Sequence, residues 1–425
     1  MTVDTDVAAM PLKLLKSKKY VLFWISSLLS NMGTWMQQVA EPWIILSMTQ
    51  SSVWVGFDSF AMNAPGWIFT LWGGVLADRR DRKKIILYFQ GVQFVCVAAL
   101  VTLLVLGWLK VWMIVFISFL VGLTDALSMP SFQSIIPSLV TADEIPKAVA
   151  YNSAQFNLSR VLGPAVAGLV IARFGAVACF GANAVSYLPF FLSLYWIYPK
   201  KAPKLKTEAP AQPISQIKEF KTFLIKNDIR IPLQTVIVTT LFCAPVLTFC
   251  PILIKDIFHS GVSGFGGAMA AFGLGGLSGA GISLLPIPNF LNRNQVSISV
   301  AILLGVATIA IGLNRSLFFL YVLLVIAGVA LTVSNVAANS YLQENATNQT
   351  RGRVASLFQL ANHGGLSIGA LVTGFTVTRF GISQALILNG GFAIILQVFN
   401  FHLSRRISKV QKLKTSQTMH ITKVL

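Results

Sequence analysis

The chain has 425 residues, of which 55% are hydrophobic and 11% are charged, and its mean hydropathy is +0.71. This composition excludes an ordinary soluble globular domain and is typical of an integral membrane protein. The net charge of +19 would suit a nucleic-acid partner, but the placement of the basic residues, described below, argues against one.

Apolar runs long enough to cross a bilayer recur along the chain. A membrane-spanning helix needs about 20 mostly apolar residues, whereas a transmembrane β-barrel shows period-two alternation in strands of roughly 10 residues. Twelve helical spans are predicted: 21–47, 53–77, 85–106, 111–130, 148–172, 177–197, 231–254, 262–285, 296–313, 317–340, 353–378 and 382–403. The first run lacks the cleavage pattern of a signal peptide, so it is expected to be retained.

Lysine and arginine residues concentrate in alternate connections between these spans. The even-numbered connections and both tails hold 27 of the 33, five lie in odd-numbered connections, and Arg160 lies inside a span. By the positive-inside rule, both termini are predicted to be cytoplasmic. The basic balance is therefore an orientation signal, and the basic loops also suit anionic lipid headgroups.

A shift of 206 residues places Arg173-Phe174-Gly175 on Arg379-Phe380-Gly381. The same shift matches Gly163, Gly168 and Asn183 with Gly369, Gly374 and Asn389. Six spans separate the matched positions, an even number, so the halves are predicted to have the same orientation as parallel repeats. The predicted fold is an all-α membrane protein with twelve transmembrane helices in two parallel six-helix repeats.

The predicted domains follow from this repeat: a cytoplasmic tail over 1–20, a six-helix bundle over 21–197, a linker over 198–230, a second bundle over 231–403 and a basic cytoplasmic tail over 404–425. In the linker, Ile217, Phe220 and Leu224 have helical spacing among lysines, which predicts an amphipathic helix on the membrane surface. A flexible spacer with accidental periodicity is the alternative.

Polar residues repeat at helical spacing in four spans, which are the first and fourth of each half. The stripes consist of Ser27, Asn31, Thr34, Gln38 and Glu41; Ser118, Gly122, Asp125 and Ser128; Thr235 and Thr239; and Thr332, Asn335 and Asn339. Because hydrocarbon offers no hydrogen bonds, such stripes are expected to face a central aqueous cavity between the halves or to hydrogen bond between helices in a solid bundle.

Five ionisable residues fall inside or near the spans: Glu41, Asp58, Asp125, Arg160 and His363. A charge at a helix centre costs roughly 2.5 to 3.5 kcal/mol on insertion scales, so a partner or a function must offset it. Asp125 and Arg160 are expected at similar depth and predict an ion pair, either structural or coupled to transport. Glu41 and Asp58 form a candidate proton-carrying pair, with Asp125 as a further candidate. Solvation of Glu41 and Asp58 at the outer surface is the alternative.

The segment Gly74-Val75-Leu76-Ala77-Asp78-Arg79-Arg80-Asp81-Arg82-Lys83-Lys84 resembles the cytoplasmic signature of the major facilitator superfamily. Asp81 replaces the usual glycine, a departure associated with the bacterial secretion effectors, the branch that includes exporters of enterobactin and other siderophores. Three further stretches resemble that branch: Pro130-Ser131-Phe132-Gln133, Pro137-Ser138-Leu139-Val140 and Arg351-Gly352-Arg353-Val354.

This resemblance implies a gate formed by Gly74, Asp78, Arg79, Arg82 and Lys83. Asp78 would meet the N-terminus of the span at 353–378, where the helix dipole favours an anion by about 0.3 to 1 kcal/mol. The alternative is that the positively charged segment only sets the orientation of the chain in the membrane. That role requires only lysine and arginine, whereas this segment also contains Asp78 and Asp81.

The stretch Gly163-Pro164-Ala165-Val166-Ala167-Gly168 resembles an element associated with antiporters, and Ala167 replaces one of its glycines. The resemblance implies export. Gly163, Pro164 and Gly168 are also expected to let the span approach the glycine-rich span at 262–285, and close packing would explain them equally well.

The resemblance therefore implies a monomeric secondary transporter of the bacterial inner membrane that exports a siderophore or similar small molecule in exchange for protons. The expected substrate cavity is lined by Asn31, Trp35, Gln38, Asp125, Arg160, Thr239, Asn335, Asn339 and His363. No cofactor or metal is expected, and an enzyme is excluded by the lack of P-loop, HExxH, GxSxG or Cys/His metal patterns.

The sequence is also compatible with several other functions. A multidrug exporter is favoured if Trp35, Trp43 and Trp67 dominate the cavity and a lipophilic cation binds at Asp125. A lysophospholipid flippase would need a lateral opening, and a siderophore importer would reverse the direction. A receptor or scaffold that transports nothing predicts a filled centre.

Overall fold

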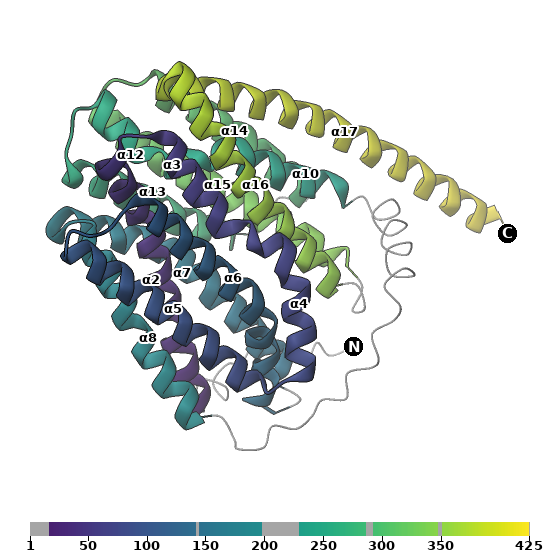
Figure 1. The fold of residues 1–425 in the computed structure, drawn as a ribbon. Helices are drawn as coiled ribbons and strands as arrows, with labels where there is room; N and C mark the ends of the chain where they lie inside the picture. Colours follow the sequence, from purple (N-terminus) through teal and green to yellow (C-terminus); the bar gives the residue numbers. More distant parts are fainter. Residues whose placement is uncertain (1–16, 142–143, 198–228, 286–291, 347–350, 425) are drawn as a thin grey trace. The chain divides into compact units, whose positions relative to one another are not determined.

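The computed structural model describes residues 17–141, 144–197, 229–285, 292–346 and 351–424 (Figure 1). Within these ranges the chain is helical and contains no strand. Every one of the predicted spans contains helix. The predicted amphipathic helix around Ile217, Phe220 and Leu224 lies outside the described residues, as does most of the predicted N-terminal tail.

The described residues of the first half of the chain form seven long or medium helices and one short 3-10 turn. They are α2 (Lys18–Thr49), α3 (Ser52–Asn63), α4 (Pro65–Arg79), α5 (Arg82–Val105), α6 (Val111–Ile135), η2 (Ile136–Ser138), α7 (Ile145–Phe174) and α8 (Val177–Ile197). The predicted span 53–77 is divided between α3 and α4. Pro65 is the first residue of α4, and a proline that lacks an N–H suits that position and interrupts a continuous helix.

From Ile229 onward, the described part of the second half begins with a broken helix. Its pieces are α10 (Arg230–Val238), the π-helical turn η3 (Thr239–Cys243), α11 (Pro245–Thr248), α12 (Cys250–Ile252) and a second π-helical turn, η4 (Leu253–Ile257). Pro245 and Pro251 remove backbone donors from this stretch, which explains why the predicted span 231–254 is not one regular helix. The remaining helices are α13 (Val262–Ile282), α14 (Arg293–Leu313), α15 (Leu317–Glu344), α16 (Arg351–Phe380) and α17 (Ile382–Val424).

Nine helices among the described residues are long and apolar enough to cross a membrane: Arg82–Val105, Val111–Ile135, Tyr151–Phe174, Val177–Ile197, Arg230–Thr248, Val262–Ile282, Arg293–Leu313, Leu317–Glu344 and Ile382–Arg406. The other predicted spans differ for two reasons. The helices α3 and α4 have 12 and 15 residues and are each short, while α2 and α16 are long but more polar. The chain is therefore a multi-pass membrane protein.

The described residues divide into two compact units. Unit 1 contains α2 to α8 together with Thr248–Gly273. Unit 2 contains residues 229–247 together with the described residues from Leu274 onward. The division passes through the broken helix and through α13, so the units do not coincide with the predicted bundles.

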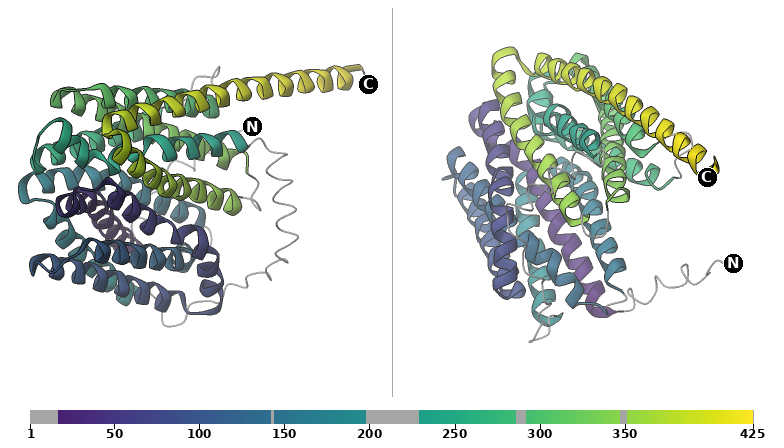
Figure 2. Two further views of the ribbon diagram at one scale, coloured as in Figure 1. Left: turned by 45° about the horizontal axis from the view of Figure 1, so that its top comes forward. Right: turned by 90° about the vertical axis from the view of Figure 1, so that its right-hand side faces the viewer.

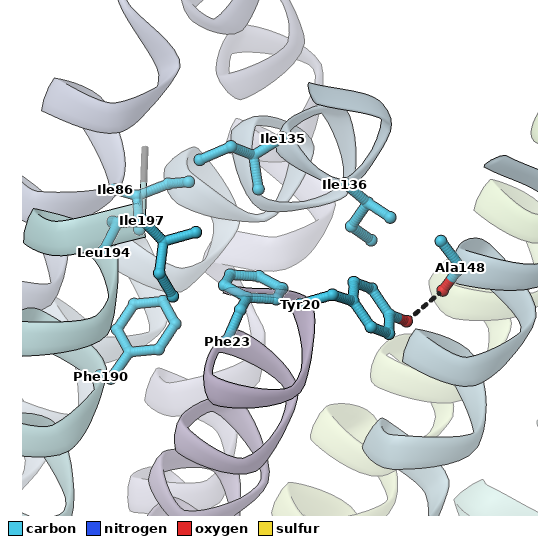
Figure 3. Packing of buried hydrophobic residues seen from close by; sticks show 9 residues of the cluster. All are labelled: Tyr20, Phe23, Ile86, Ile135, Ile136, Ala148, Phe190, Leu194 and Ile197. Carbon is cyan, nitrogen blue, oxygen red and sulfur yellow. Dashed lines mark hydrogen bonds between the residues drawn. The ribbon is translucent and has the colours of Figure 1, made fainter. Parts of the chain in front are cut away.

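In unit 1, α2 packs along α7 and α8, while α6 packs against α3, α4 and α5 (Figure 1). Buried apolar side chains join the ends of these helices: Tyr20, Phe23, Ile86, Ile135, Ile136, Ala148, Phe190, Leu194 and Ile197. The Tyr20 hydroxyl lies at the edge of this cluster and donates to the Ala148 carbonyl at 2.9 Å (Figure 3). The side chain thus keeps its aromatic ring in the core while its one polar atom is satisfied.

In unit 2, α14 packs against α15 and α17, and α16 packs against α10 and η3. The predicted span 382–403 is the first part of α17, which continues as one helix to Val424 (Figure 2). Beyond Arg406 the helix path is described but the side chains are not.

Two helices in different units have closely related limits. α7 (Ile145–Phe174) and α16 (Arg351–Phe380) are each 30 residues long, and both are followed by a glycine with φ of +81°, Gly175 and Gly381. A positive φ is easily adopted only by glycine, so the same residue type ends both helices for the same reason.

Candidate functional site

Two acidic side chains meet inside unit 1 where α2, α3 and α6 come together. Glu41 on α2 and Asp58 on α3 are 4% and 5% exposed, which excludes the alternative that both are solvated at the membrane surface. The Ser118 hydroxyl on α6 donates to Glu41 Oε1 at 3.0 Å and lies within hydrogen-bonding reach of Asp58. The two carboxyl groups also interact electrostatically, so we treat Glu41, Asp58 and Ser118 as one cluster, the carboxyl cluster.

Asp58 is incompletely satisfied in this cluster. Its Oδ1 atom is buried and has no hydrogen-bond partner among the described residues. A buried carboxyl oxygen without a partner is costly when the group is ionised, and two negative charges in one buried site are costlier still. The arrangement is therefore suited to holding a proton among the packed helices of unit 1.

The polar stripe of α2 is not uniform. Ser27 and Glu41, at its two ends, are buried, whereas Asn31, Thr34 and Gln38 between them are partly exposed. Of the two buried ends, Glu41 bonds to Ser118 on α6, whereas the Ser27 hydroxyl has no hydrogen-bond partner among the described residues. Whether the stripe faces a central cavity stays a prediction.

Arg160 on α7 approaches α2 at Trp35, the residue that follows Thr34 of this stripe. Its guanidinium carbon is 5.9 Å from the centroid of the Trp35 ring, at the outer limit of a cation–π contact. Gly163, one turn further along α7, makes this approach possible, because a Cβ at that position would overlap the Trp35 side chain. The predicted cavity residues Trp35 and Arg160 are thus brought together by a glycine that the sequence marked for packing.

The predicted ion pair between Asp125 and Arg160 is wrong. Among the described residues, the ion pair that forms joins Arg293 and Glu344 in unit 2. α7, which carries Arg160, packs on α2 and α8, whereas α6, which carries Asp125, packs on α3, α4 and α5. Two spans consecutive in sequence are therefore not neighbours here, and the Asp125 side chain is exposed instead.

Two buried hydrogen bonds in unit 1 link α8 with α2 and with α5, and the sequence alone did not indicate either pairing. Asn183 donates to Gln37 Oε1 at 2.7 Å, and Tyr187 donates to Gln93 Oε1 at 3.4 Å. All four side chains are buried. Asn183 matches Asn389 in the internal repeat, but Gln37 lies off the predicted polar stripe. The contact between Asn183 and Gln37 therefore follows only from the packing of the helices.

The charged segment predicted to form the gate makes contacts inside unit 1. Asp81 accepts hydrogen bonds from the backbone N–H groups of Lys83 and Lys84 and so caps α5. Arg82 donates to the Ser134 carbonyl on α6 at 3.0 Å. The departure of Asp81 from the usual glycine thus has a local structural reason, because aspartate is among the preferred N-cap residues.

Lys83 in the same segment donates to the Tyr195 carbonyl at 3.4 Å and also lies 5.5 Å above the ring of that tyrosine. Gly74 and Asp78 lie on α4, and Arg79, the last residue of that helix, is exposed. The Asp78 side chain is outside the described part of the structure. Its predicted partner at the start of α16 therefore stays a prediction.

The glycines of the second family-like element serve close packing within unit 1. A Cβ at Gly168 would overlap the backbone of Gly266 and Ala270, and one at Gly273 would overlap Ala165. α7 and α13 are thus in backbone contact along this element. Small residues are the usual means of such an approach between membrane helices.

The remaining predicted cavity residues belong to unit 2. Thr239 is buried in the π-helical turn, and its hydroxyl donates to the carbonyls of Thr235 and Val236. Asn335 is 8% exposed, and its amide donates to the Leu331 carbonyl. Two further candidates, Asn339 on α15 and His363 on α16, are partly exposed.

A multi-pass helical chain whose spans hold a carboxyl pair and a separate arginine has the character of a membrane transporter, since such groups are retained in spans for function. Comparison with known proteins identifies the family: the chain belongs to the transmembrane secretion effectors of the major facilitator superfamily, which match residues 9–424. This confirms the predicted family, whose members are transporters and not enzymes.

The relatives include proteins with different substrates. The chain is 23% identical over 410 residues to the staphyloferrin A transporter of Staphylococcus aureus (strain NCTC 8325 / PS 47), covering 94% of this chain and 98% of that protein. It is 23% identical over 387 residues to macrolide efflux protein A of Streptococcus pyogenes, covering 89% and 94%.

A solved structure shows the fold. The crystal structure of a bacterial homolog of the human lysosomal transporter Spinster, in an inward-facing and unoccupied conformation, is similar with a TM-score of 0.73. It is 15% identical and covers 93% of this chain and 98% of that chain. The likeness supports a major facilitator fold.

Proposed function

We propose that this transporter exports a siderophore or similar small molecule across the bacterial inner membrane in exchange for protons, as a monomer with both termini in the cytoplasm. Two parallel six-helix repeats, twelve spans in all, would alternate in access around a cavity between them. The carboxyl cluster is the observation that carries the proposal, because it places two acids and one shared hydroxyl inside the spans.

In this mechanism the carboxyl cluster holds a proton that entered from the outside and releases it toward the cytoplasm after the substrate has left. A transporter that binds the proton and the substrate in alternation couples the two gradients. Asp125, which is exposed on α6, is a second candidate for the proton-binding step.

The gate of the mechanism is assigned to Gly74, Asp78, Arg79, Arg82 and Lys83. Arg82 and Lys83 bind backbone carbonyls of α6 and α8, which would keep the segment in place on its own unit. Asp78 would then be free to form and break its contact with the N-terminus of α16. A contact of modest energy is suitable for a gate, because binding of a substrate can reverse it.

The packing contacts of the tryptophan side chains favour a siderophore over a lipophilic drug as the substrate. Trp43 stacks on Phe265 with ring centroids 5.1 Å apart, and Trp67 contacts Phe60 edge-on at 6.4 Å. Two of the three tryptophans that would mark a multidrug site are thus engaged in packing, and the third, Trp35, lies under a cation. The staphyloferrin A relative supports the same choice, and the macrolide relative keeps drug efflux as the second candidate.

The proton step is tested in proteoliposomes that hold the full chain and an imposed pH gradient. We expect Glu41→Gln and Asp58→Asn to abolish gradient-driven transport while exchange of substrate without a gradient persists. Asp256→Asn, which alters an exposed acid on η4, is the matched control and should transport normally. Normal gradient-driven flux in Glu41→Gln, Asp58→Asn and Asp125→Asn would remove these acids from the mechanism.

Direction and substrate are tested in cells. Deletion of the gene in a strain with intact siderophore synthesis should lower extracellular siderophore, and an Asp78→Ala copy should restore it incompletely. Unchanged secretion with altered uptake would reverse the direction. Unchanged siderophore levels with increased macrolide sensitivity would favour the second candidate.

A further inference from the structure

Arg160 is a cation that unit 1 does not neutralise with an acid. It lies midway along α7, a helix that crosses the membrane, and no carboxylate of the described residues forms an ion pair with it. Its side chain is partly exposed, so the charge is not sealed within the helix packing. A charge kept at such a position in a membrane protein indicates a ligand or a pathway.

The surroundings of Arg160 are suited to an anion that also carries an apolar part. The Trp35 ring lies on one side of the guanidinium, with its centroid 5.9 Å from the guanidinium carbon. Asn31 precedes Trp35 by one turn of α2 and Gln38 follows it by one turn, so both amides lie near the same face of the helix. Both side chains are partly exposed, and neither makes a hydrogen bond to another described residue.

We propose that Arg160, Asn31 and Gln38 bind a carboxylate group of the transported molecule, with the Trp35 ring as the apolar floor of the site. This rests on the proposed function and names the substrate class as small organic acids. The planar guanidinium offers paired N–H donors that match the two oxygens of a carboxylate, and each amide adds N–H donors. The same charge repels a permanently cationic drug.

Trp35 acts as a positioning residue in this site. Contact with the ring holds the guanidinium in one orientation, so less freedom is lost when the carboxylate binds. Phenylalanine keeps a ring face for the cation and leucine does not. A Trp35→Phe variant is therefore expected to bind the acid within a fewfold of the unaltered protein, and Trp35→Leu to bind it more weakly.

The test measures equilibrium binding of citrate and of its neutral trimethyl ester to the full chain in lipid nanodiscs by isothermal titration calorimetry. We expect citrate to bind the unaltered protein more tightly than the ester does. Arg160→Gln should weaken citrate binding at least tenfold and leave ester binding unchanged, and Arg160→Lys should lie between. Arg173→Gln, which alters an exposed arginine at the end of the same helix, is the control and should bind as the unaltered protein does.

Thermal unfolding in the same nanodiscs shows whether each variant is folded, and Arg160→Lys keeps the test informative if Arg160→Gln is not. The proposal is overturned if citrate does not bind the unaltered protein, if it binds no better than its ester, or if Arg160→Gln binds it equally well. Tighter Arg160-dependent binding of glycerol 3-phosphate would replace the carboxylate with a phosphate. Binding is measured without a gradient, so loss of transport with intact citrate binding would count against the proposed function and leave this site standing.

Discussion

The Ser118 hydroxyl lies 3.0 Å from Glu41 Oε1 and connects α6 with α2 at the point where α3 brings Asp58 to the same place. A hydroxyl can donate one hydrogen bond and accept others, so Ser118 can serve either carboxyl group in either protonation state. Ser118 is thus the non-acidic member of the carboxyl cluster. It can be substituted while both carboxyl groups are kept.

Ser118→Ala is expected to weaken the link between substrate and proton without removing either acid. Without the hydroxyl, Glu41 loses its bond to α6 and the carboxyl cluster loses the group that both acids reach. Substrate exchange should persist, while the number of protons moved per substrate should fall. Proton flux measured with a pH-sensitive dye alongside labelled substrate provides the ratio.

Ser118→Thr keeps the hydroxyl and is the matched control for that substitution. An unchanged proton-to-substrate ratio in Ser118→Ala would show that the hydroxyl takes no part in coupling. An equal fall in both variants would point to altered packing of α6 and not to the lost hydrogen bond.

Gly163→Ala is expected to disturb the contact between α7 and α2. The added methyl group would overlap the Trp35 side chain, and overpacking of this kind costs about 1 to 3 kcal/mol. The melting temperature in detergent should fall, and the cation–π contact of Arg160 should be displaced. Gly181→Ala on α8, where a Cβ meets no atom within 4 Å, is the control and should change the melting temperature little.

Individual residues show which features of the fold can be predicted from the sequence and which cannot. The positions of the helices follow from apolar run length, and Pro65, Gly175 and Gly381 mark interruptions and ends that can be read directly from the sequence. The partners of Arg160 and Gln37 could not be read in this way. They depend on which helices are neighbours, a property of the packed unit that periodicity along a single helix does not contain.

The carboxyl cluster shows the same division. Spacing along the chain allowed Glu41 and Asp58 to be either solvated at the outer surface or paired in one site. Their burial in the structure excludes solvation at the surface. Ser118 was predicted to lie on a polar stripe, but its contact with Glu41 depends on the approach of α6 to α2. The residue types can therefore be read from the sequence, whereas their partners depend on the packing of the helices.

Asp81→Ala is expected to destabilise the start of α5. Asp81 accepts hydrogen bonds from two backbone N–H groups, and loss of an N-cap aspartate typically costs about 0.5 to 2 kcal/mol, whereas replacement by glycine costs a few tenths. The order of melting temperature should be unaltered protein, then Asp81→Gly, then Asp81→Ala. An Asp81→Ala protein as stable as the unaltered one would show that the cap contributes nothing measurable.

Asp78→Ala tests whether the charged segment is a gate or only an orientation signal. In the gate model, the aspartate favours the state that is closed on the cytoplasmic side, so its loss should increase the population that is open there. Distances between spin labels on the cytoplasmic ends of α4 and α16 should then lengthen, while insertion and orientation stay unchanged because the basic residues remain. Asp78→Asn keeps the size of the side chain without its charge and should behave as Asp78→Ala does, because the expected partner is the positive end of a helix dipole. A distance distribution that neither variant alters would reduce the segment to an orientation signal anchored by Arg82 and Lys83.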